Sequence, residues 1–123
     1  MKTEVSEIII NGVAYVPKDN APTLAPAKDG LKQVLIRSVQ SGVHYGWMKS
    51  RDGGEVVLID ARRCWYWAGA CSLSQLASEG TKKPTECKFS VPVPEITVLN
   101  VIEVIPLTSS AAKNLNAVPE WKQ

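Results

Sequence analysis

Two apolar runs on either side of a turn signal near the start of the chain predict a β-hairpin, and a linker follows it. Two short β-branched runs flank the dipeptide Asn11-Gly12. Asn-Gly readily adopts the positive φ angles of a two-residue turn, so we predict a hairpin arm over residues 1–16. Residues 17–30 hold three prolines and no aromatic residue, which predicts a linker. Because an isolated hairpin is marginally stable, we expect the arm to pack on its own domain or on a neighbouring subunit, and we predict a homo-oligomer.

After the linker, runs of apolar residues predict a meander of strands. Strands are expected over residues 33–39, 43–49 and 55–59. The Asp-Gly-Gly sequence at residues 52–54 predicts a tight turn between the second and third of them. A further short strand is predicted over residues 60–67.

The hydrophobic period then changes to that of a helix. Ser72 and Gln75 have the spacing of a capping box, and Gly80 is placed to end the helix. Thr108 is the predicted N-cap of a second short helix over residues 109–116.

Two further apolar segments lie between the predicted helices and complete the sheet. They cover residues 87–91 and 95–105, and the second is expected to reverse at Leu99-Asn100. Strands that occur in runs, and do not alternate with helices, indicate an α+β fold. We therefore predict a domain over residues 31–123, with a mainly antiparallel sheet of about six strands and two short helices.

Composition and charge narrow the classes of protein. The chain has 123 residues, 45% hydrophobic and 21% charged, which is typical of one globular domain. We expect no signal peptide and no membrane segment, because no apolar run approaches about 20 residues. The net charge is +2, which disfavours nucleic acid as a partner. The excess of bases over acids in residues 28–63 fits either a site for an anionic small molecule or an ordinary solvated face.

The cysteines and the missing motifs argue against a metal site and against catalysis. Cys64, Cys71 and Cys87 form no CxxC pair, and their spacing with His44 matches no common zinc pattern. We predict reduced thiols, no metal and no cofactor. The sequence holds no nucleophile elbow, zincin or Walker motif, so we predict that the protein is not an enzyme.

Three arginines are candidate ligand-binding residues. Arg37 lies in an otherwise apolar strand, where a charge is costly unless it is paired or lines a pocket. Arg62 and Arg63 are adjacent, so on a strand they would point to opposite faces. Arginine suits phosphate because its planar fork donates two parallel hydrogen bonds. The alternative is a structural ion pair with Asp60 or Glu55.

One histidine and two tryptophans complete the candidate site. His44 could donate to a phosphate or carbonyl, or it could be a half-buried histidine satisfied by backbone. Strand alternation would send Trp65 and Trp67 to one face. There they could stack on a base or ring, or they could simply fill a small core.

The run from Ser41 to Gly46, the longer run from Asp60 to Ala70 and the helix segment Leu73–Ala77 carry a family resemblance. It extends through residues 87–90 and 102–106 to the closing Val-Pro-Glu-Trp. The chain resembles, over about residues 31–121, an uncharacterised family of small phage and prophage proteins known only as a domain of unknown function. The resemblance implies a phage origin and a place in the host bacterial cytoplasm, and it implies no activity.

Two hypotheses about function follow. The first is a phage-encoded, non-enzymatic binding protein that sequesters an anionic nucleotide-like immune signal of the bacterial host, with the arginines, His44 and the tryptophans in an interface pocket. The alternative is a phage structural protein, or one that binds a host protein, with no small-molecule ligand. A pocket where arginines converge with Trp65 or Trp67 favours the first, and a flat apolar patch favours the second.

Overall fold

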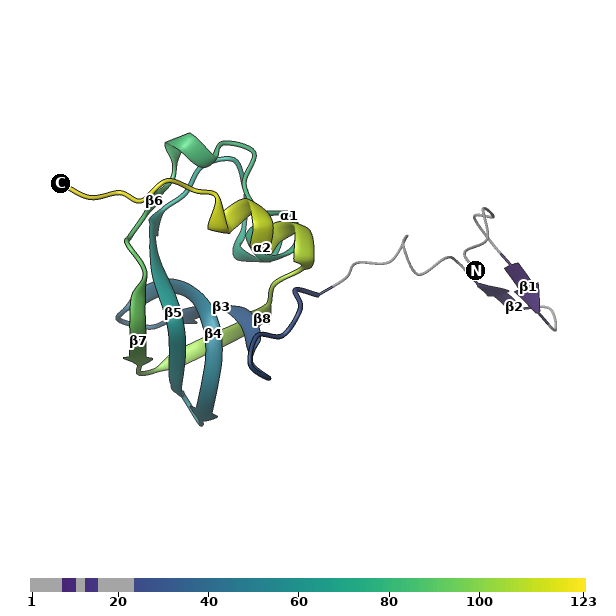
Figure 1. Ribbon diagram of the computed structural model, residues 1–123, viewed down its shortest axis with the longest axis horizontal. Coiled ribbons are helices and arrows are strands. Elements are labelled where there is room, and N and C mark those ends of the chain that lie inside the picture. Colours follow the sequence, from purple (N-terminus) through teal and green to yellow (C-terminus); the bar gives the residue numbers. More distant parts are fainter. Residues whose placement is uncertain (1–7, 11–12, 16–23) are drawn as a thin grey trace.

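The computed structural model describes residues 8–10, 13–15 and 24–123 (Figure 1). Strands β1 (Ile8–Ile10) and β2 (Val13–Tyr15) pair antiparallel, with Ile9 opposite Ala14, as a separate two-stranded sheet. The strands of the predicted hairpin are therefore present. The predicted Asn11-Gly12 turn, the start of the arm and the first part of the linker lie outside the described residues.

The main sheet has six strands in the order β6-β5-β4-β3-β8, with β7 also paired to β5, and every pairing is antiparallel. With two helices beside it, this confirms the predicted α+β class. The strands are β3 (Lys32–Ser38), β4 (Gly42–Asp52), β5 (Glu55–Tyr66), β6 (Lys88–Phe89), β7 (Val93–Val98) and β8 (Val101–Pro106). The short strand predicted over residues 60–67 is instead the second half of β5, which runs on without a break.

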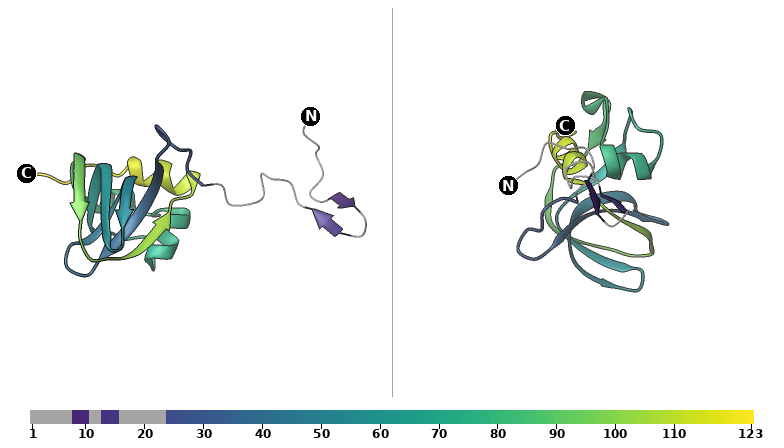
Figure 2. Two further views of the ribbon diagram at one scale, coloured as in Figure 1. Left: turned by 90° about the horizontal axis from the view of Figure 1, so that it is seen from below. Right: turned by 90° about the vertical axis from the view of Figure 1, so that its right-hand side faces the viewer.

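The sheet is strongly curled (Figure 2). Strands β7 and β8 pair with β5 and β3 respectively, yet they follow one another in the chain through the predicted reversal at Leu99-Asn100. Asn100 has a φ of 57°, a left-handed conformation that asparagine tolerates well. The backbone of this turn bonds to Val39 and Gly54, so the turn joins the two sides of the curled sheet.

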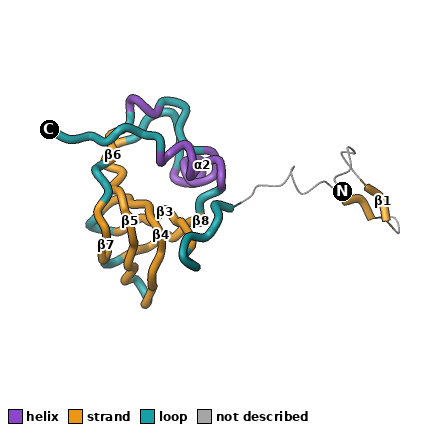
Figure 3. Tube along the Cα trace, viewed as in Figure 1, coloured by secondary structure: helices purple, strands orange, loops and turns teal. Residues whose placement is uncertain are grey.

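Helices α1 (Leu73–Glu79) and α2 (Ser109–Asn116) pack together on one face of the sheet, coloured purple in Figure 3. Their predicted N-caps are confirmed: Ser72 Oγ accepts from the Gln75 amide at 3.1 Å, and Thr108 Oγ1 accepts from the Ala111 amide at 3.1 Å. Gly80 ends α1 as predicted. A single 3-10 turn, Pro84–Glu86, precedes β6.

The sheet separates two hydrophobic clusters. The inner cluster fills the concave face of the curled sheet, and its buried members are Val34, Ile36, Val56, Leu58, Ala61 and Val98. The helix-side cluster lies between the sheet and the helices, and its largest buried members are Tyr45, Phe89, Leu35, Leu76, Leu107 and Leu115. Because both faces of β3 are covered at its centre, the three consecutive residues Val34, Leu35 and Ile36 are all apolar and buried.

A bulge in β5 reverses which face its residues occupy. Tyr45 is opposite Arg62 and Trp47 is opposite Ile59, so two residues of β5, Asp60 and Ala61, share the position opposite Gly46. Asp60 takes a positive φ of 50°. A Cβ atom on Gly46 would lie 3.0 Å from Ala61 Cα, so a glycine is needed for the strands to approach this closely.

Residues 24–30, predicted as part of the linker, are bound to the domain. Ala25 donates its amide to Leu107 O at 2.9 Å, and Leu24 pairs with Thr108. Lys28 and Leu31 exchange two backbone hydrogen bonds around the turn at Asp29-Gly30. No helix formed by the described residues is long and apolar enough to cross a membrane.

Candidate ligand-binding site

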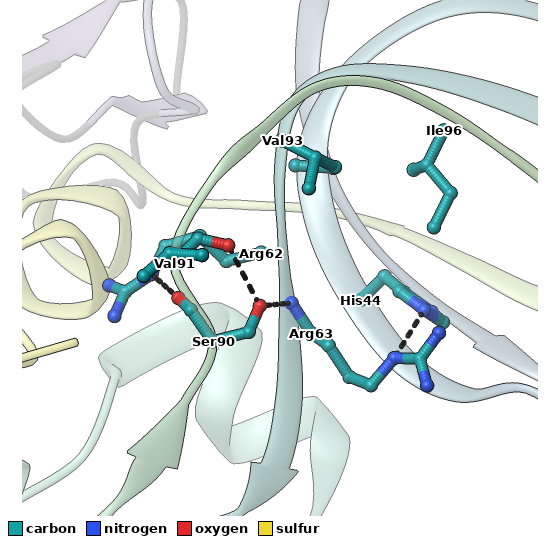
Figure 4. A pocket seen from close by; sticks show the side chains of 8 residues that line it. His44, Arg62, Arg63, Ser90, Val91, Val93 and Ile96 are labelled. Atoms are coloured by element: carbon teal, nitrogen blue, oxygen red, sulfur yellow. Dashed lines mark hydrogen bonds between the residues drawn. The ribbon is translucent and has the colours of Figure 1, made fainter. Parts of the chain in front are cut away.

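His44 and Arg63 lie at a pocket of about 320 Å³ at the edge of the concave face, here called the β5 pocket (Figure 4). The two residues are directly opposite one another on β4 and β5. Arg63 Nε donates to His44 Nε2 at 3.2 Å. The other residues that line the pocket are Ala61, Arg62, Ser90, Val91, Val93 and Ile96. Apolar walls thus surround a histidine and an exposed guanidinium, and the lining contains no carboxylate.

The hydrogen bond from Arg63 fixes the tautomer of His44. Because Nε2 accepts this bond, the ring proton of neutral His44 must lie on Nδ1. Nδ1 is buried and has no hydrogen-bond partner among the described residues. Burial and the nearby Arg63 charge lower the pKa of His44 from 6.5 to about 4. At neutral pH His44 is therefore an uncharged ring with an unsatisfied N–H donor.

Arg63 keeps most of its hydrogen-bonding capacity. Its two Nη groups donate to no acceptor among the described residues, and no described carboxylate forms an ion pair with it. The predicted alternative, a pair with Asp60, is not what the structure shows, because Asp60 is 3.1 Å from Lys28 Nζ. Arg63 is held at its backbone instead: its amide donates to Ser90 Oγ at 2.8 Å, and its carbonyl accepts from the Ser90 amide at 2.9 Å.

Arg62 points to the helix side and is buried. Nε donates to Ser90 O at 2.8 Å, Nη1 donates to Tyr45 Oη and Leu115 O, and Nη2 donates to Phe89 O and Pro119 O. These are five acceptors for the five N–H groups of a guanidinium. Arg62 therefore has no donor left for a ligand, although part of its side chain lines the β5 pocket.

Tyr45 supports Arg62 from the adjacent strand. Its hydroxyl donates to Leu115 O at 3.0 Å and accepts from Arg62 Nη1 at 3.2 Å. Burial raises the pKa of Tyr45 to about 12, so the hydroxyl stays protonated. Arg62 also lies over the ring of Phe89 at 5.4 Å. Together these contacts tie β5 to the last turn of α2, where the helix dipole favours a cation.

The structure does not bring the other predicted residues into the β5 pocket. Arg37 is exposed and pairs with Glu103 at 3.5 Å. Trp67 lies beyond the end of β5 and packs against the helix-side cluster. Strand alternation therefore does not extend from Trp65 to Trp67, and the predicted common face of the two tryptophans is not formed: Trp65 is 60% exposed.

Trp65 stacks on a residue that sequence reasoning missed. The rings of Trp65 and Trp121 have centroids 5.1 Å apart and planes 20° from parallel. Lys88 Nζ lies 5.3 Å and 5.2 Å from the two centroids. Nothing in the local sequence pairs Trp121 with Trp65, because they meet only when the C-terminal segment runs parallel to β6, with Glu120 beside Phe89.

A second pocket of about 250 Å³ lies near Arg62 on the other side of the bulge. Its charged lining residues are Lys28, Asp60, Arg62 and Glu120. Lys28 also sits over the Trp47 ring at 5.7 Å. Two acids balance two bases here, and both Lys28 and Arg62 already have partners. This pocket is therefore less suited to an anion than the β5 pocket.

The cysteines are free thiols. Cys64 and Cys87 are buried, and Cys71 is exposed. Burial raises the pKa of the Cys64 thiol, so it is unreactive at neutral pH. Cys87 donates weakly to the carbonyl oxygens of Ala68 and Lys83. Across the described part of the chain, no three His, Cys, Asp or Glu side chains are grouped so that they could hold a metal ion.

The fold and site thus define a small α+β domain with a cationic pocket beside a curled antiparallel sheet. The chain belongs to the family of the domain of unknown function DUF6948, whose model matches residues 31–115. The match confirms the predicted membership of a family known only as a domain of unknown function. No curated protein and no solved structure matches the chain.

Proposed function

We propose that this protein is a non-enzymatic binding protein for an anionic, nucleotide-like small molecule. The observation that carries the proposal is the Arg63 side chain at the β5 pocket: both of its Nη groups are unused by described residues, and no carboxylate lines the pocket. A phosphate or carboxylate oxygen bound there would accept hydrogen bonds from the two free Nη groups of Arg63. His44 is 1% exposed, so its part is to hold Arg63 in place through Nε2.

The rest of the pocket favours the same class of ligand. Val91, Val93 and Ile96 supply apolar walls, and Ser90 adds a hydroxyl. A few convergent polar groups on an apolar surface are typical of small-molecule sites. A volume of about 320 Å³ is at the lower end of such sites, so the pocket suits one part of a nucleotide.

Binding without catalysis fits the chemistry of these residues. His44 is held neutral and its Nε2 is occupied by Arg63, and the pKa of His44, about 4, is far from that of a base working at neutral pH. The pocket lining offers neither a carboxylate nor a thiol as a second proton carrier or nucleophile.

In biological terms, we propose that the protein is phage-encoded, acts in the host bacterial cytoplasm and sequesters a nucleotide signal of host immunity. Sequestration requires only tight binding, which a small non-catalytic domain can supply. We also propose that it works as a homo-oligomer, because two paired strands of three residues each, β1 and β2, are marginally stable without further packing. Light scattering of the full chain at micromolar concentration should give a mass above 13.4 kDa.

Calorimetric titration tests the proposal. The ligands are a panel of cyclic dinucleotides, cyclic trinucleotides and ADP-ribose. At least one should bind the wild type, and Arg63→Ala should weaken that binding about tenfold or more, since a charge-assisted contact contributes about 1.5–3 kcal/mol. Arg63→Lys should also weaken it, because an ammonium cannot reproduce the guanidinium fork. Arg51, an exposed arginine on β4, provides the control: Arg51→Ala should leave the affinity unchanged.

The immune-signal part has its own test. Protein expressed in a host with active nucleotide-signalling defences should carry a small bound molecule that native mass spectrometry detects. Protein from a host without those defences should lack that mass. The same spectrum from both hosts would contradict the proposed signal.

One observation favours the alternative, an interaction with a host or virion protein. Trp65, Tyr66 and Trp121 are 60%, 50% and 45% exposed, and exposed aromatic residues are enriched at protein interfaces. If no member of the nucleotide panel binds the wild type, the sequestration proposal fails and this alternative takes its place.

A further inference from the structure

Trp65 and Trp121, here called the indole pair, form an exposed aromatic surface. The rings lie nearly parallel with centroids 5.1 Å apart. They cover one another on one side only, which leaves them 60% and 45% exposed. Such exposure of two tryptophans costs free energy in water, so contact with a further flat apolar group would be favourable.

The C-terminal segment holds the indole pair in place. The Trp121 amide donates to Phe89 O at 2.8 Å, and Glu120 pairs with Phe89. Two residues earlier, Pro119 O accepts from the buried Arg62 at 3.3 Å. Trp121 is thus anchored through its own amide and through the two residues before it, and the stacked geometry does not depend on the two rings alone.

The indole pair is on the same face of β5 as the β5 pocket. Beyond the bulge, Ala61 faces the inner cluster, and Arg63 contacts His44 on the same side. Arg62 and Cys64 face the helix side. Trp65, the next residue after Cys64, contacts Lys88. Residues two apart on a strand are about 7 Å apart. The β5–β6 register shifts between Cys64 and Tyr66, and Trp65 does not line the β5 pocket itself. Arg63 and Trp65 lie on either side of Cys64, which faces the helix side, so the indole pair lies beside the pocket, at about the distance that a single sugar places between a base and its phosphate.

We propose that the indole pair and Lys88 form a ring-binding subsite that continues the β5 pocket. This inference rests on the proposed function and sharpens it: the ligand is a nucleotide whose aromatic base stacks on the indole pair while a phosphate is bound by Arg63. Stacking on tryptophan tolerates any base, because every base has a π face.

Lys88 adds charge to the subsite. Its ammonium lies within 5.3 Å of both ring centroids, close enough for cation–π attraction. It therefore sits beside any base stacked on the rings, where a second phosphate would meet it. Two separated cations, Arg63 and Lys88, favour a ligand with more than one negative charge over a mononucleoside.

The test compares ligands with and without a base. The full-length wild type is titrated with cyclic di-AMP, ADP-ribose and ribose 5-phosphate, the last of which has a phosphate but no base. The variants Trp65→Leu and Trp121→Leu should each weaken binding of the base-containing ligand about tenfold and leave ribose 5-phosphate unaffected. Tyr66→Leu is the matched control, since Tyr66 is exposed on the same strand but outside the stacked pair.

Fluorescence gives a second readout. A bound base should quench tryptophan emission in the wild type, and this ligand-dependent quenching should be lost in the double variant Trp65→Leu/Trp121→Leu. Thermal melting of each variant shows whether it is folded. Lys88→Ala, which leaves both rings in place, should weaken a ligand with two phosphate groups more than ribose 5-phosphate, which has one.

The outcomes separate the two proposals. If binding depends on Arg63 but not on Trp65, Trp121 or the presence of a base, the ring subsite is wrong and the anion site stands. If the tryptophan variants weaken ribose 5-phosphate as much as the nucleotides, the indole pair acts only on the fold and the subsite is again wrong. If neither these three ligands nor any other member of the nucleotide panel binds the wild type, both proposals fail.

Discussion

Arg62 and Arg63 are adjacent in the chain and identical in chemistry, yet the two faces of β5 give them opposite surroundings. Arg62 is buried on the helix side, and its five N–H groups meet five acceptors of the protein. Arg63 is exposed and donates through Nε to His44 alone among the described residues. An arginine is therefore available to a ligand only if some of its N–H donors are unused, whatever its charge.

The largest expected effect is on stability, at Arg62. Arg62→Met removes hydrogen bonds that tie β5 to α2 and to the C-terminal segment, and it leaves buried carbonyl groups without a donor. We expect a loss of about 3–5 kcal/mol in the free energy of unfolding. Arg63→Met should cost less, about 1 kcal/mol, because it removes one hydrogen bond, from Nε to His44 Nε2, at an exposed position.

Urea denaturation followed by circular dichroism measures both values. Arg62→Lys should rescue little, because an ammonium has three donors and cannot reach five acceptors at once. Equal stability losses for Arg62→Met and Arg63→Met would contradict the contrast between the two faces.

The next effect is on the pH dependence of folding. Burial and the Arg63 charge lower the pKa of His44 from 6.5 to about 4. Between these two values the unfolded chain binds the proton and the folded chain does not. The stabilisation is therefore complete above pH 6.5 and is lost as the pH falls toward 4, by up to about 3 kcal/mol.

Urea midpoints measured from neutral pH down to pH 4 test this expectation. His44→Gln should show a shallower decrease over that interval than the wild type, since carboxylate titration is common to both proteins. If the urea midpoints of the wild type and His44→Gln fall in parallel as the pH decreases, the pKa of His44 is not lowered by folding.

A smaller effect is expected at the bulge that separates the two arginines. A Cβ atom on Gly46 would lie 3.0 Å from both Ala61 Cα and Ile59 O. Both are backbone atoms that cannot easily move, so Gly46→Ala should destabilise the fold by about 1–3 kcal/mol. Asp60→Asn serves as the control: asparagine tolerates a positive φ, and loss of the exposed pair with Lys28 costs less than about 1 kcal/mol. Thermal melting of the two variants compares them directly.

The smallest effect is expected at Arg37. Its ion pair with Glu103 is exposed on both sides, 54% and 45%, and such pairs contribute about 0–1 kcal/mol. Arg37→Ala should therefore shift the melting temperature slightly and leave ligand affinity unchanged in the same calorimetric assay. A tenfold loss of affinity would show that Arg37 contacts the ligand and that the ligand site extends beyond the β5 pocket.

Much of the fold could be predicted because local sequence determines it. The turn at residues 52–54, the capping residues Ser72 and Thr108, and the reversal at Leu99-Asn100 each depend on a few neighbouring residues, and the structure confirms them. The continuation of β5 through residues 60–66 could not be predicted in the same way. It depends on the close approach of Gly46 from another strand.

The candidate site was only partly predictable, for the same reason. Alternation correctly placed Arg62 and Arg63 on opposite faces, but it could not tell which face is buried, because the bulge at Asp60 changes the side on which every later residue of β5 lies. Trp121 and Lys88 were missed because their meeting with Trp65 is a tertiary contact. Trp67 was misplaced because β5 ends at Tyr66.

We expect the face of β5 that holds Arg63 to bind an anion and the face that holds Arg62 not to bind one. Proton–nitrogen correlation spectra of the arginine Nε–H and histidine ring groups, recorded while cyclic di-AMP or ADP-ribose is added, test it most directly. As ligand is added, the Arg63 Nε–H and His44 Nδ1–H signals should shift until binding is saturated, and the Arg62 Nε–H signal should stay in place. A shift of Arg62 without Arg63, or no shift of either Arg63 or His44 with any ligand of the panel, would contradict it.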